Sequence, residues 1–382
     1  MNGDARLAAL RDLAREWGDQ FRAAAPELDR DPDAVHRYLD LPGVRHLSTY
    51  GTPREYGGRP LRVGPYAFEG TGAVEHVVLL EELARGDAGL TLAAPGPSMS
   101  GVLVDKLADP AQRAEYYTRI VSEPIWTCFA LTEPGHGSDA SAMETTLRPG
   151  ADGRFVLSGR KRYVGNAARA QVAVVFARTG SGPLGVTAVL VDTGCAGYRA
   201  EPLDTLGLRG AQLGAVTLDD LPVEPERVLG RHLSPVRRGM WACVQVFNRL
   251  RPGVAALALG IAGAAHAYVV EQRPAARGAA RDRIEELGHR IAATRSLVLR
   301  AAAEVDATGD GHLASAAKAR ACALAEEVTL AGCELLAPAA RASHPLLDKL
   351  ARDARGVEFM EGTRNIQHLN LFPGLRAGRA AG

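Results

Sequence analysis

The spacing of hydrophobic residues changes twice along the chain. Up to about residue 120, apolar residues recur every three or four positions, and in "TGAVEHVVLLEELARGDAG" this spacing relates Val74, Val77, Leu80 and Leu83. Such a period is typical of an amphipathic helix that packs one face on a core. The preceding stretch "YGTPREYGGRP" is dense in Gly and Pro, which predicts a turn-rich connection to an N-terminal helix.

Between about residues 125 and 230 the pattern is that of short strands. The runs "RFVLSGRKRYVG", "AQVAVVFART", "GVTAVLVDT" and "GAVTLDDLPV" are rich in strand-forming residues and are separated by Gly, Ser, Asp and Pro. Their spacing leaves no room for crossover helices, so it predicts a compact antiparallel barrel or sandwich.

Helical spacing returns after about residue 236. Long helices are expected over residues 254–272, 282–306 and 314–336, the last ending before Pro338. The chain is therefore predicted to be mainly α with a small β-domain. Its three parts are expected to be an N-terminal helical domain (1–122), a middle β-domain (123–234) and a C-terminal helical bundle (235–382).

The composition narrows the class of protein. The chain has 382 residues, a formal net charge of +1 and 46% hydrophobic residues, so its overall charge favours neither nucleic acid nor an anionic membrane. The charged first residues suggest neither a signal peptide nor a membrane anchor, and the longest apolar run, 253–270, is expected to be a buried helix. Five scattered cysteines without a CxxC pair predict neither disulfides nor a metal site and favour a reducing cytoplasm.

Two segments carry candidate chemistry. In "CFALTEPGHGSDASAM", two glycines let the backbone approach a planar or anionic ligand, and Thr132 and Ser138 can donate hydrogen bonds; an ordinary Gly-rich turn is the alternative. Near the end of the chain, Glu361 follows a helical run and precedes Gly362, where the helix dipole disfavours a negative charge. From the residue type alone, a solvated glutamate at a helix end is the favoured interpretation.

Several segments together resemble the acyl-CoA dehydrogenase family. "LTEPGHGSD" resembles its flavin-binding T-E-P-x-x-G-S-D segment, and "GRKRYVGNA" resembles its G-x-K-x-[WY]-x-x-N segment. "LGLRGAQLGAVTLDDLPVEPERVLG" is similar to its G-x-R-x-(S/T) strand pair, and "RDARGVEFMEGTRNIQ" to its R-D-x(6-7)-E-G-T-x-x-I-Q ending. With "PREYGG" and "EELARGDAG" near the start, the similarity spans nearly the whole chain. It implies N-terminal helices, a middle β-domain, a C-terminal four-helix bundle, and FAD between the last two.

The resemblance also implies which residues contact the cofactor. Tyr163 would stack beside the flavin where the family often has Trp, and Gly165 stands where a Thr or Ser commonly donates a hydrogen bond. Thr363 would reach the flavin or its diphosphate. The residues expected along the isoalloxazine and ribityl region are Phe129, Leu131, Thr132, Gly137 and Ser138.

Glu361 falls on the family's usual base position. The resemblance implies that its carboxylate removes the α-proton of an acyl thioester while the β-hydrogen leaves as hydride to FAD, and that its N–H helps hold the thioester oxygen. The base position that some members use instead is Leu250 here, which cannot serve. Substrate contacts are implied at Arg251, Asn248 and Gly362, with a stabilising bundle arginine as the alternative for Arg251.

Two family elements are missing. Residues 271–288 lack the R-x-x-F-G element, and residues 333–343 lack the glycines of Q-x-x-G-G-x-G. Both elements serve the adenine half of FAD, so either other contacts hold it, with Arg273, Arg277 or Arg341 supplying charge, or FAD is bound weakly or differently. Because these elements normally meet across a subunit interface, a homodimer is expected at least as readily as a homotetramer.

The expected activity is FAD-dependent α,β-dehydrogenation of an acyl thioester carried by CoA or by an acyl carrier protein, the latter as in specialised metabolism. The implied electron acceptor is an electron-transfer flavoprotein. Two alternatives stay open: a flavin acyl-thioester oxidase or monooxygenase of the same fold, and a flavin-free interaction subunit. The retained Glu361 speaks against a monooxygenase but not against an oxidase.

Overall fold

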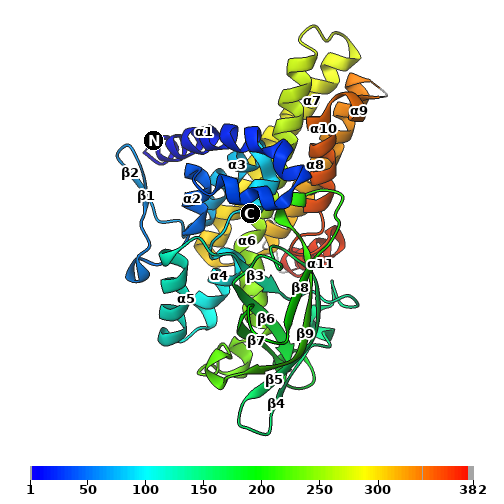
Figure 1. Cartoon of the computed structure of the whole chain (residues 1–382). Helices are drawn as coiled ribbons and strands as arrows, with labels where there is room; N and C mark the ends of the chain where they lie inside the picture. The colour runs from blue at the N-terminus through cyan, green and yellow to red at the C-terminus, as the bar shows by residue number, and fades with distance from the viewer. Residues whose placement is uncertain (1, 338, 377–382) are drawn as a thin grey trace.

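A computed structural model describes residues 2–337 and 339–376 and shows helices packed above a curled β-sheet (Figure 1). The N-terminal part is helical, as the spacing predicts. It also contains a short hairpin, β1 (Leu61–Val63) and β2 (Tyr66–Phe68), that the turn-rich sequence did not reveal. Its helices are α1 (Asn2–Arg30), α2 (Pro42–Ser48), α3 (Ala73–Ala93), α4 (Ser98–Leu107) and α5 (Pro110–Ser122).

Helix α3 is buried on nearly all sides, so it is not the amphipathic helix that its spacing predicts. It lies between α1 and the later helix α6, and even Glu81 and Glu82 are buried. Their charges are paired, Glu82 with Arg15 at 3.1 Å and Glu81 with Arg295 at 2.6 Å. A helix with partners on both sides needs apolar residues all round, and its acids need cations from the neighbouring helices.

A seven-stranded sheet forms the middle of the chain. Its order is β3-β6-β4-β5-β9-β8, with β7 on β6, and most pairs are antiparallel as expected. The sheet is not wholly antiparallel, because β3 runs parallel to β6 with Thr127 opposite Val172. The strands are β3 (Thr127–Ala130), β4 (Thr146–Pro149), β5 (Phe155–Val164), β6 (Val172–Arg178), β7 (Val186–Asp192), β8 (Tyr198–Pro202) and β9 (Gly214–Val223).

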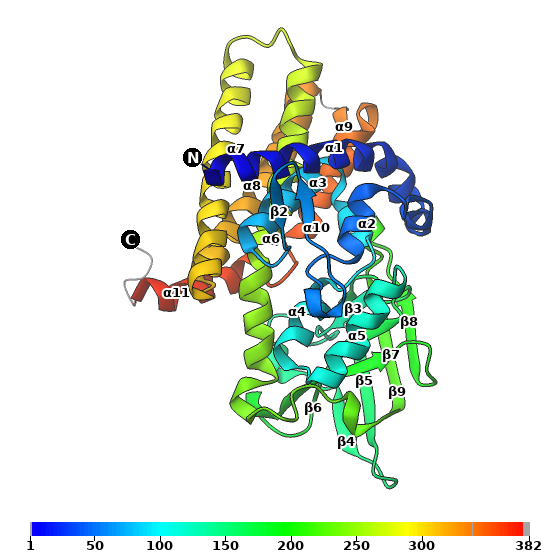
Figure 2. The same ribbon diagram turned by 90° about the vertical axis from the view of Figure 1, so that its left-hand side faces the viewer.

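The C-terminal part is a bundle around one long helix. Helix α6 begins at Met240, earlier than predicted, because it continues through Pro252 instead of beginning after it. The end of α6 and the start of α7 project beyond the other helices (Figures 1 and 2). The helices are α6 (Met240–Gln272), α7 (Ala279–Thr308), α8 (His312–Leu336), α9 (Ala340–Ser343), α10 (Pro345–Val357) and α11 (Arg364–Arg376).

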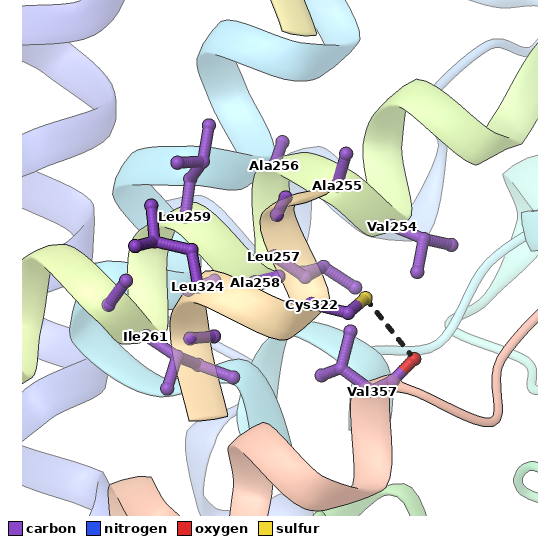
Figure 3. Close-up of a cluster of buried hydrophobic side chains, with 14 of the residues drawn as sticks. Val254, Ala255, Ala256, Leu257, Ala258, Leu259, Ile261, Cys322, Leu324 and Val357 are labelled. Atoms are coloured by element: carbon purple, nitrogen blue, oxygen red, sulfur yellow. Dashed lines mark hydrogen bonds between the residues drawn. The ribbon is translucent and has the colours of Figure 1, made fainter. Parts of the chain in front are cut away.

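Small apolar residues bring α6 against α8 and α10 (Figure 3). Val254, Leu257 and Leu324 are buried there, and the Cys322 thiol donates to the Val357 carbonyl at 3.8 Å. The segment 235–272 is long and apolar enough to cross a membrane, yet 72% of its most apolar window is buried inside the structure, as in a core helix. The apolar run of α6 is thus part of the bundle core.

One buried ionic cluster joins all three parts of the chain. The Lys349 ammonium of α10 lies 2.7 Å from the Asp87 carboxylate of α3 and 2.6 Å from the Asp353 carboxylate. Asp353 also accepts a hydrogen bond of 2.6 Å from the N–H of Leu208, which precedes β9. The backbone of α3 is non-helical at Asp87, which turns this acid toward α10. We call Asp87, Lys349, Asp353 and Leu208 the junction cluster.

Candidate active site

Glu361 lies in a tight turn between α10 and α11, which we call the base turn (residues 358–363). Helix α10 ends at Val357, four residues earlier than the sequence suggested, so the helix terminus itself does not end at the carboxylate. Glu361 has φ +50°, in the left-handed region that side chains other than Gly rarely adopt. Such a conformation persists only where the surroundings hold it in place.

Donors from two neighbouring helices hold the base turn. The Lys318 ammonium of α8 donates to the Glu358 carbonyl at 2.6 Å and to the Gly362 carbonyl at 2.5 Å. The buried Gln367 amide of α11 donates to the carbonyls of Glu361 and Gly362 at 3.0 and 2.8 Å. The backbone carbonyls of Glu358, Glu361 and Gly362 thus all accept hydrogen bonds. These bonds fix the backbone that carries the Glu361 carboxylate.

The carboxyl group of Glu361 is enclosed but has no hydrogen-bond partner at Oε2. Burial raises its pKa to about 8, although the charges of Arg251 and Lys318 act in the opposite direction. The residue as a whole is partly accessible because its other atoms face an internal cavity. A raised pKa in a cleft is the property that a proton acceptor near neutral pH needs.

The cavity beside Glu361 has a volume of about 200 Å³. Helix α6 contributes Leu250, Val254 and Leu257, which recur at the helical period along one face. The opposite walls come from α3 and α4, so the cavity lies between the N-terminal helices and the bundle. Its apolar lining further includes Leu47, Leu80, Leu92, Met99, Val102 and Met360.

Arg251 lies directly behind the base. It is 5% exposed, and its Nε donates to the Glu361 carbonyl at 3.4 Å. Burial lowers the pKa of Arg251, and the nearby Glu361 opposes that change. Asn248 accepts a hydrogen bond from Arg251 Nη1 at 3.1 Å and faces Gly309, so it lies outside the cavity lining and orients the arginine.

Phe129 connects the predicted flavin segment to the base. Its ring on β3 lies 5.0 Å from that of Phe176 and 6.2 Å from that of Phe247 on α6, between centroids. The Arg251 guanidinium lies 5.6 Å from the Phe247 ring, so packed side chains extend from β3 to the base turn. Leu131 is buried at the end of the same strand.

The loop after β3 carries the predicted hydroxyl donors. Gly137 and Ser138 are exposed and Thr132 is half-buried. A Cβ at Gly137 would meet nothing nearer than Thr132 Cγ2 at 3.9 Å, so the loop is open toward a ligand. Tyr163, at the end of β5, exposes 58% of its surface and has φ +61°, which presents its ring for stacking. Gly165 follows Tyr163 by two residues, and Thr363 ends the base turn.

A buried ion pair fixes that loop. The Lys161 ammonium lies 2.9 Å from Glu133 Oε1 and donates to the Leu131 carbonyl at 3.0 Å. Glu133 also accepts from the N–H groups of Glu144 and Thr145. Burial lowers the pKa of Lys161 to about 8; burial alone would raise that of Glu133, but Lys161 and the N–H donors lower it.

The three arginines predicted to supply charge to the cofactor diphosphate differ in whether other groups of the chain already bind them. Arg273 donates to the Leu335 carbonyl, and Arg341 donates to Asp348 at 2.7 Å, so both have partners within the chain. Arg277 is exposed on the projecting loop between α6 and α7. Their role toward a diphosphate stays a prediction. In the described residues, no cluster of three His, Cys, Asp or Glu could hold a metal ion.

The sequence did not single out three residues that support the site. Lys318 is the lone cation within the alanine-rich run 314–319, and a single charge surrounded by small apolar residues could have indicated a buried lysine. Glu133 and Lys161 both lie inside quoted motifs, but nothing in their spacing indicates that they pair.

Comparison with known proteins places this site in a family. Models described as the N-terminal, middle and C-terminal domains of acyl-CoA dehydrogenase match residues 5–124, 128–221 and 237–373. The chain belongs to the acyl-CoA dehydrogenase family, as its motifs imply, and it is therefore an oxidoreductase.

Among its relatives is a 3-(aryl)acrylate reductase of Clostridium sporogenes, 29% identical over 78% of each chain. A short-chain specific acyl-CoA dehydrogenase of Megasphaera elsdenii is 28% identical over 68% of this chain and 66% of its own. The solved butyryl-CoA dehydrogenase of the same organism has a TM-score of 0.83 and 25% identity, and the match covers 97% of both chains. The solved butyryl-CoA dehydrogenase therefore has the same fold as the present chain.

Proposed function

We propose that the chain is an FAD-dependent acyl-thioester dehydrogenase in which Glu361 takes the α-proton. The observation that carries this proposal is the Glu361 carboxyl, buried, without a partner at Oε2, and placed on the wall of an apolar cavity. An α-proton of a thioester is weakly acidic, so its acceptor has to be close, dry and of raised pKa. Burial raises the pKa of Glu361, and its place on the cavity wall would bring its carboxyl close to a bound thioester.

The residues present fit a flavin. An open glycine loop with the hydroxyls of Thr132 and Ser138 ends near an exposed Tyr163 ring, a combination of donors and stacking surface suited to a flat heteroaromatic group. FAD supplies a hydride acceptor when bound. We propose Phe129, Leu131, Gly137, Gly165 and Thr363 as its further contacts.

The base turn adds electrostatic support for the thioester. The Glu361 N–H donates to no backbone carbonyl in the described part of the chain, which leaves it available to the thioester oxygen. Arg251 holds the carbonyl of the same residue, and its buried charge lies behind the site where negative charge would develop. Gly362, with φ +99°, lets the chain turn away from the cavity directly after the base.

The reverse reaction is a second candidate, favoured by one observation. Burial raises the pKa of Glu361 to about 8, so near neutral pH the carboxyl can keep its proton and is also placed to deliver it to the α-carbon of an enoyl thioester. The relative from Clostridium sporogenes is named as a reductase. The physiological direction then depends on the electron partner and not on the position of the base.

Anaerobic mixing of the flavin-loaded protein with acyl thioesters tests the proposal. We expect loss of the oxidised flavin absorption with a saturated acyl thioester, and Glu361→Gln to abolish it while the flavin stays bound. Leu250 lines the same cavity, so Leu250→Gln serves as a control for the effect of placing an amide side chain in the cavity wall. Turnover that survives Glu361→Gln would refute the base, and a colourless protein that takes up no FAD would refute the enzyme.

The carrier of the acyl group and the assembly are further parts of the proposal. CoA and an acyl carrier protein both present a thioester on a pantetheine arm, so we propose either of them as the carrier. A solved prolyl acyl carrier protein oxidase shares the fold with a TM-score of 0.82, but at 18% identity it shows no more than the fold. We propose an electron-transfer flavoprotein as electron partner, a homodimer or homotetramer as the assembly and the cytoplasm as location.

A further inference from the structure

The cavity wall contains polar groups that the proposed dehydrogenation does not use. Tyr50 in the loop after α2, His76 of α3 and Arg249 of α6 line the same cavity as Glu361. The rings of Tyr50 and His76 lie 5.4 Å apart between centroids, and the charge of Arg249 acts on the titration of both. We call these three residues the polar wall.

The Tyr50 hydroxyl is a buried donor without a partner. Burial raises the pKa of this phenol well above its ordinary value, so it keeps its proton and can donate a hydrogen bond. The hydroxyl of Tyr117, which lines the same cavity, instead donates to the Asp105 carboxylate at 2.8 Å, with the Gly101 carbonyl 3.3 Å away. The cavity therefore contains one satisfied and one unsatisfied phenol.

Arg249 contributes a second unused donor. Its Nη2 donates to the Thr71 carbonyl, but its Nη1 is buried without a hydrogen bond and lies 3.9 Å from Asp306 Oδ1. The Asp306 carboxylate already accepts from the N–H groups of Ala73 and Val74 at 2.6 and 3.1 Å. Arg249 Nη1 thus has an ion-pair partner in Asp306 but makes no hydrogen bond.

His76 adds a neutral ring, because burial, reinforced by Arg249, lowers its pKa to about 3. Two glycines make room for the rings of the polar wall. A Cβ at Gly253 would lie 2.8 Å from His76 Cδ2, and one at Gly70 would lie 3.0 Å from Tyr50 Cε2. A side chain at Gly253 or Gly70 would therefore collide with the His76 or the Tyr50 ring.

We infer that the polar wall binds a hydrogen-bond-accepting oxygen on the acyl group of the substrate, so that the substrate is a polar-substituted acyl thioester and not a plain fatty acyl thioester. This inference rests on the proposed function, because it takes the cavity as the acyl site. Buried donors without partners destabilise a protein, and a hydrocarbon chain in this cavity would leave the Tyr50 hydroxyl and Arg249 Nη1 without a hydrogen bond. An acceptor oxygen on the acyl group would supply the hydrogen-bond partner that the Tyr50 hydroxyl lacks, and Arg249 lies on the wall of the same cavity.

Binding of matched CoA thioesters tests the inference. In the Glu361→Gln background, which prevents turnover, calorimetry compares valeryl-CoA with 4-hydroxybutyryl-CoA and 4-methylpentanoyl-CoA with succinyl-CoA. The members of each pair have nearly the same shape and differ in carrying methyl groups or oxygens. We expect the polar member of at least one pair to bind about tenfold more tightly, the gain of roughly one good hydrogen bond. The pair that shows the preference indicates whether the polar wall binds a hydroxyl or a carboxylate of the acyl group.

Tyr50→Phe is the decisive variant, because it removes one oxygen and keeps the ring. We expect it to reduce the preference for the polar member several-fold without weakening the apolar member. It should leave the melting temperature unchanged or slightly higher, since the hydroxyl has no internal partner. Tyr117→Phe, its matched control, should lower the melting temperature because it breaks the bond to Asp105.

The outcomes test the polar wall and the proposed dehydrogenase function separately. If all four thioesters bind and neither polar member is favoured, the polar wall is refuted while the proposed function stands. If none of them binds, both are refuted. A fall in the melting temperature of Tyr50→Phe equal to that of Tyr117→Phe would show that the Tyr50 hydroxyl has a partner within the protein and would also refute the polar wall.

Discussion

The Lys318 ammonium lies 2.5 Å from the Gly362 carbonyl, although the two residues are 44 positions apart. Lys318 is fully buried on α8, and Gly362 directly follows the proposed base. A buried lysine is costly unless its donors are used, and here they bind the backbone of the base turn. The bundle thereby determines where the Glu361 carboxylate lies. The charge of Lys318 also opposes the rise in the pKa of Glu361 that burial causes.

Replacing Lys318 with Met tests this support. Met fills the space of the lysine stem but leaves the Glu358 carbonyl without its donor, so we expect the free energy of unfolding to fall by about 2 kcal/mol. Arg320→Met, on the exposed side of α8, should change it by no more than about 0.5 kcal/mol. Denaturant unfolding measures both. Equal losses would mean that the buried contacts of Lys318 do not stabilise the base turn.

The raised pKa of Glu361 predicts how stability varies with pH. Between the ordinary value of 4.5 and about 8, the folded protein keeps a proton on Glu361 that the unfolded chain has released. Raising the pH through this window therefore lowers the contribution of this residue to stability. Glu361→Gln cannot release a proton, so its melting temperature should exceed that of the wild type at pH 8 and match it more closely at pH 5. Parallel curves for the two proteins would contradict a raised pKa.

The buried pair of Lys161 and Glu133 predicts non-additive variants. Lys161→Met leaves an acid buried without its cation, which typically costs about 3–5 kcal/mol of stability. The double variant with Glu133→Gln should recover part of that loss, because no charge stays unpaired. Thermal unfolding reports on the stability of the fold, and uptake of FAD reports on the loop after β3. Arg160→Met, exposed on the same strand, is the control. If the losses of stability in the two single variants simply add up in the double variant, Lys161 and Glu133 are not directly coupled.

Gly165 offers a gain-of-binding test. A Cβ there would lie no nearer than 3.9 Å to the Ala211 carbonyl and Leu213, so a larger residue fits. We expect Gly165→Thr to tighten FAD binding by up to about tenfold through one added hydrogen bond, with little change in melting temperature. Gly165→Val has the same shape without the hydroxyl and should give no gain. Equal affinities for the Thr and Val variants would place the flavin elsewhere.

The order of helices, strands and helices was predictable because hydrophobic spacing follows local geometry. The predictions for α3 and α6 failed where tertiary context differs from the common case. Helix α3 has neighbours on opposite sides, so its acids are buried in ion pairs, and α6 continues through Pro252 because the surrounding bundle supports it. Residue spacing alone does not contain this information.

The candidate site was predictable where it depends on a motif and not where it depends on packing. Glu361 could be named from its motif, and the structure shows it on a cavity wall with a raised pKa, although the cause is burial and not a helix end. The polar wall could not be predicted, because Tyr50, His76 and Arg249 come from three elements that only the folded chain brings together.

The junction cluster has a consequence for how such a chain can be recombined. Asp87 comes from the N-terminal helices, and Lys349 and Asp353 come from the C-terminal bundle. Leu208 comes from the β-domain. A chimera that takes its first 122 residues from a relative without an acid at position 87 would bury the Lys349 ammonium with half of its counter-charge. The three segments are therefore exchangeable only as a matched set, and the cluster limits how independently they can evolve.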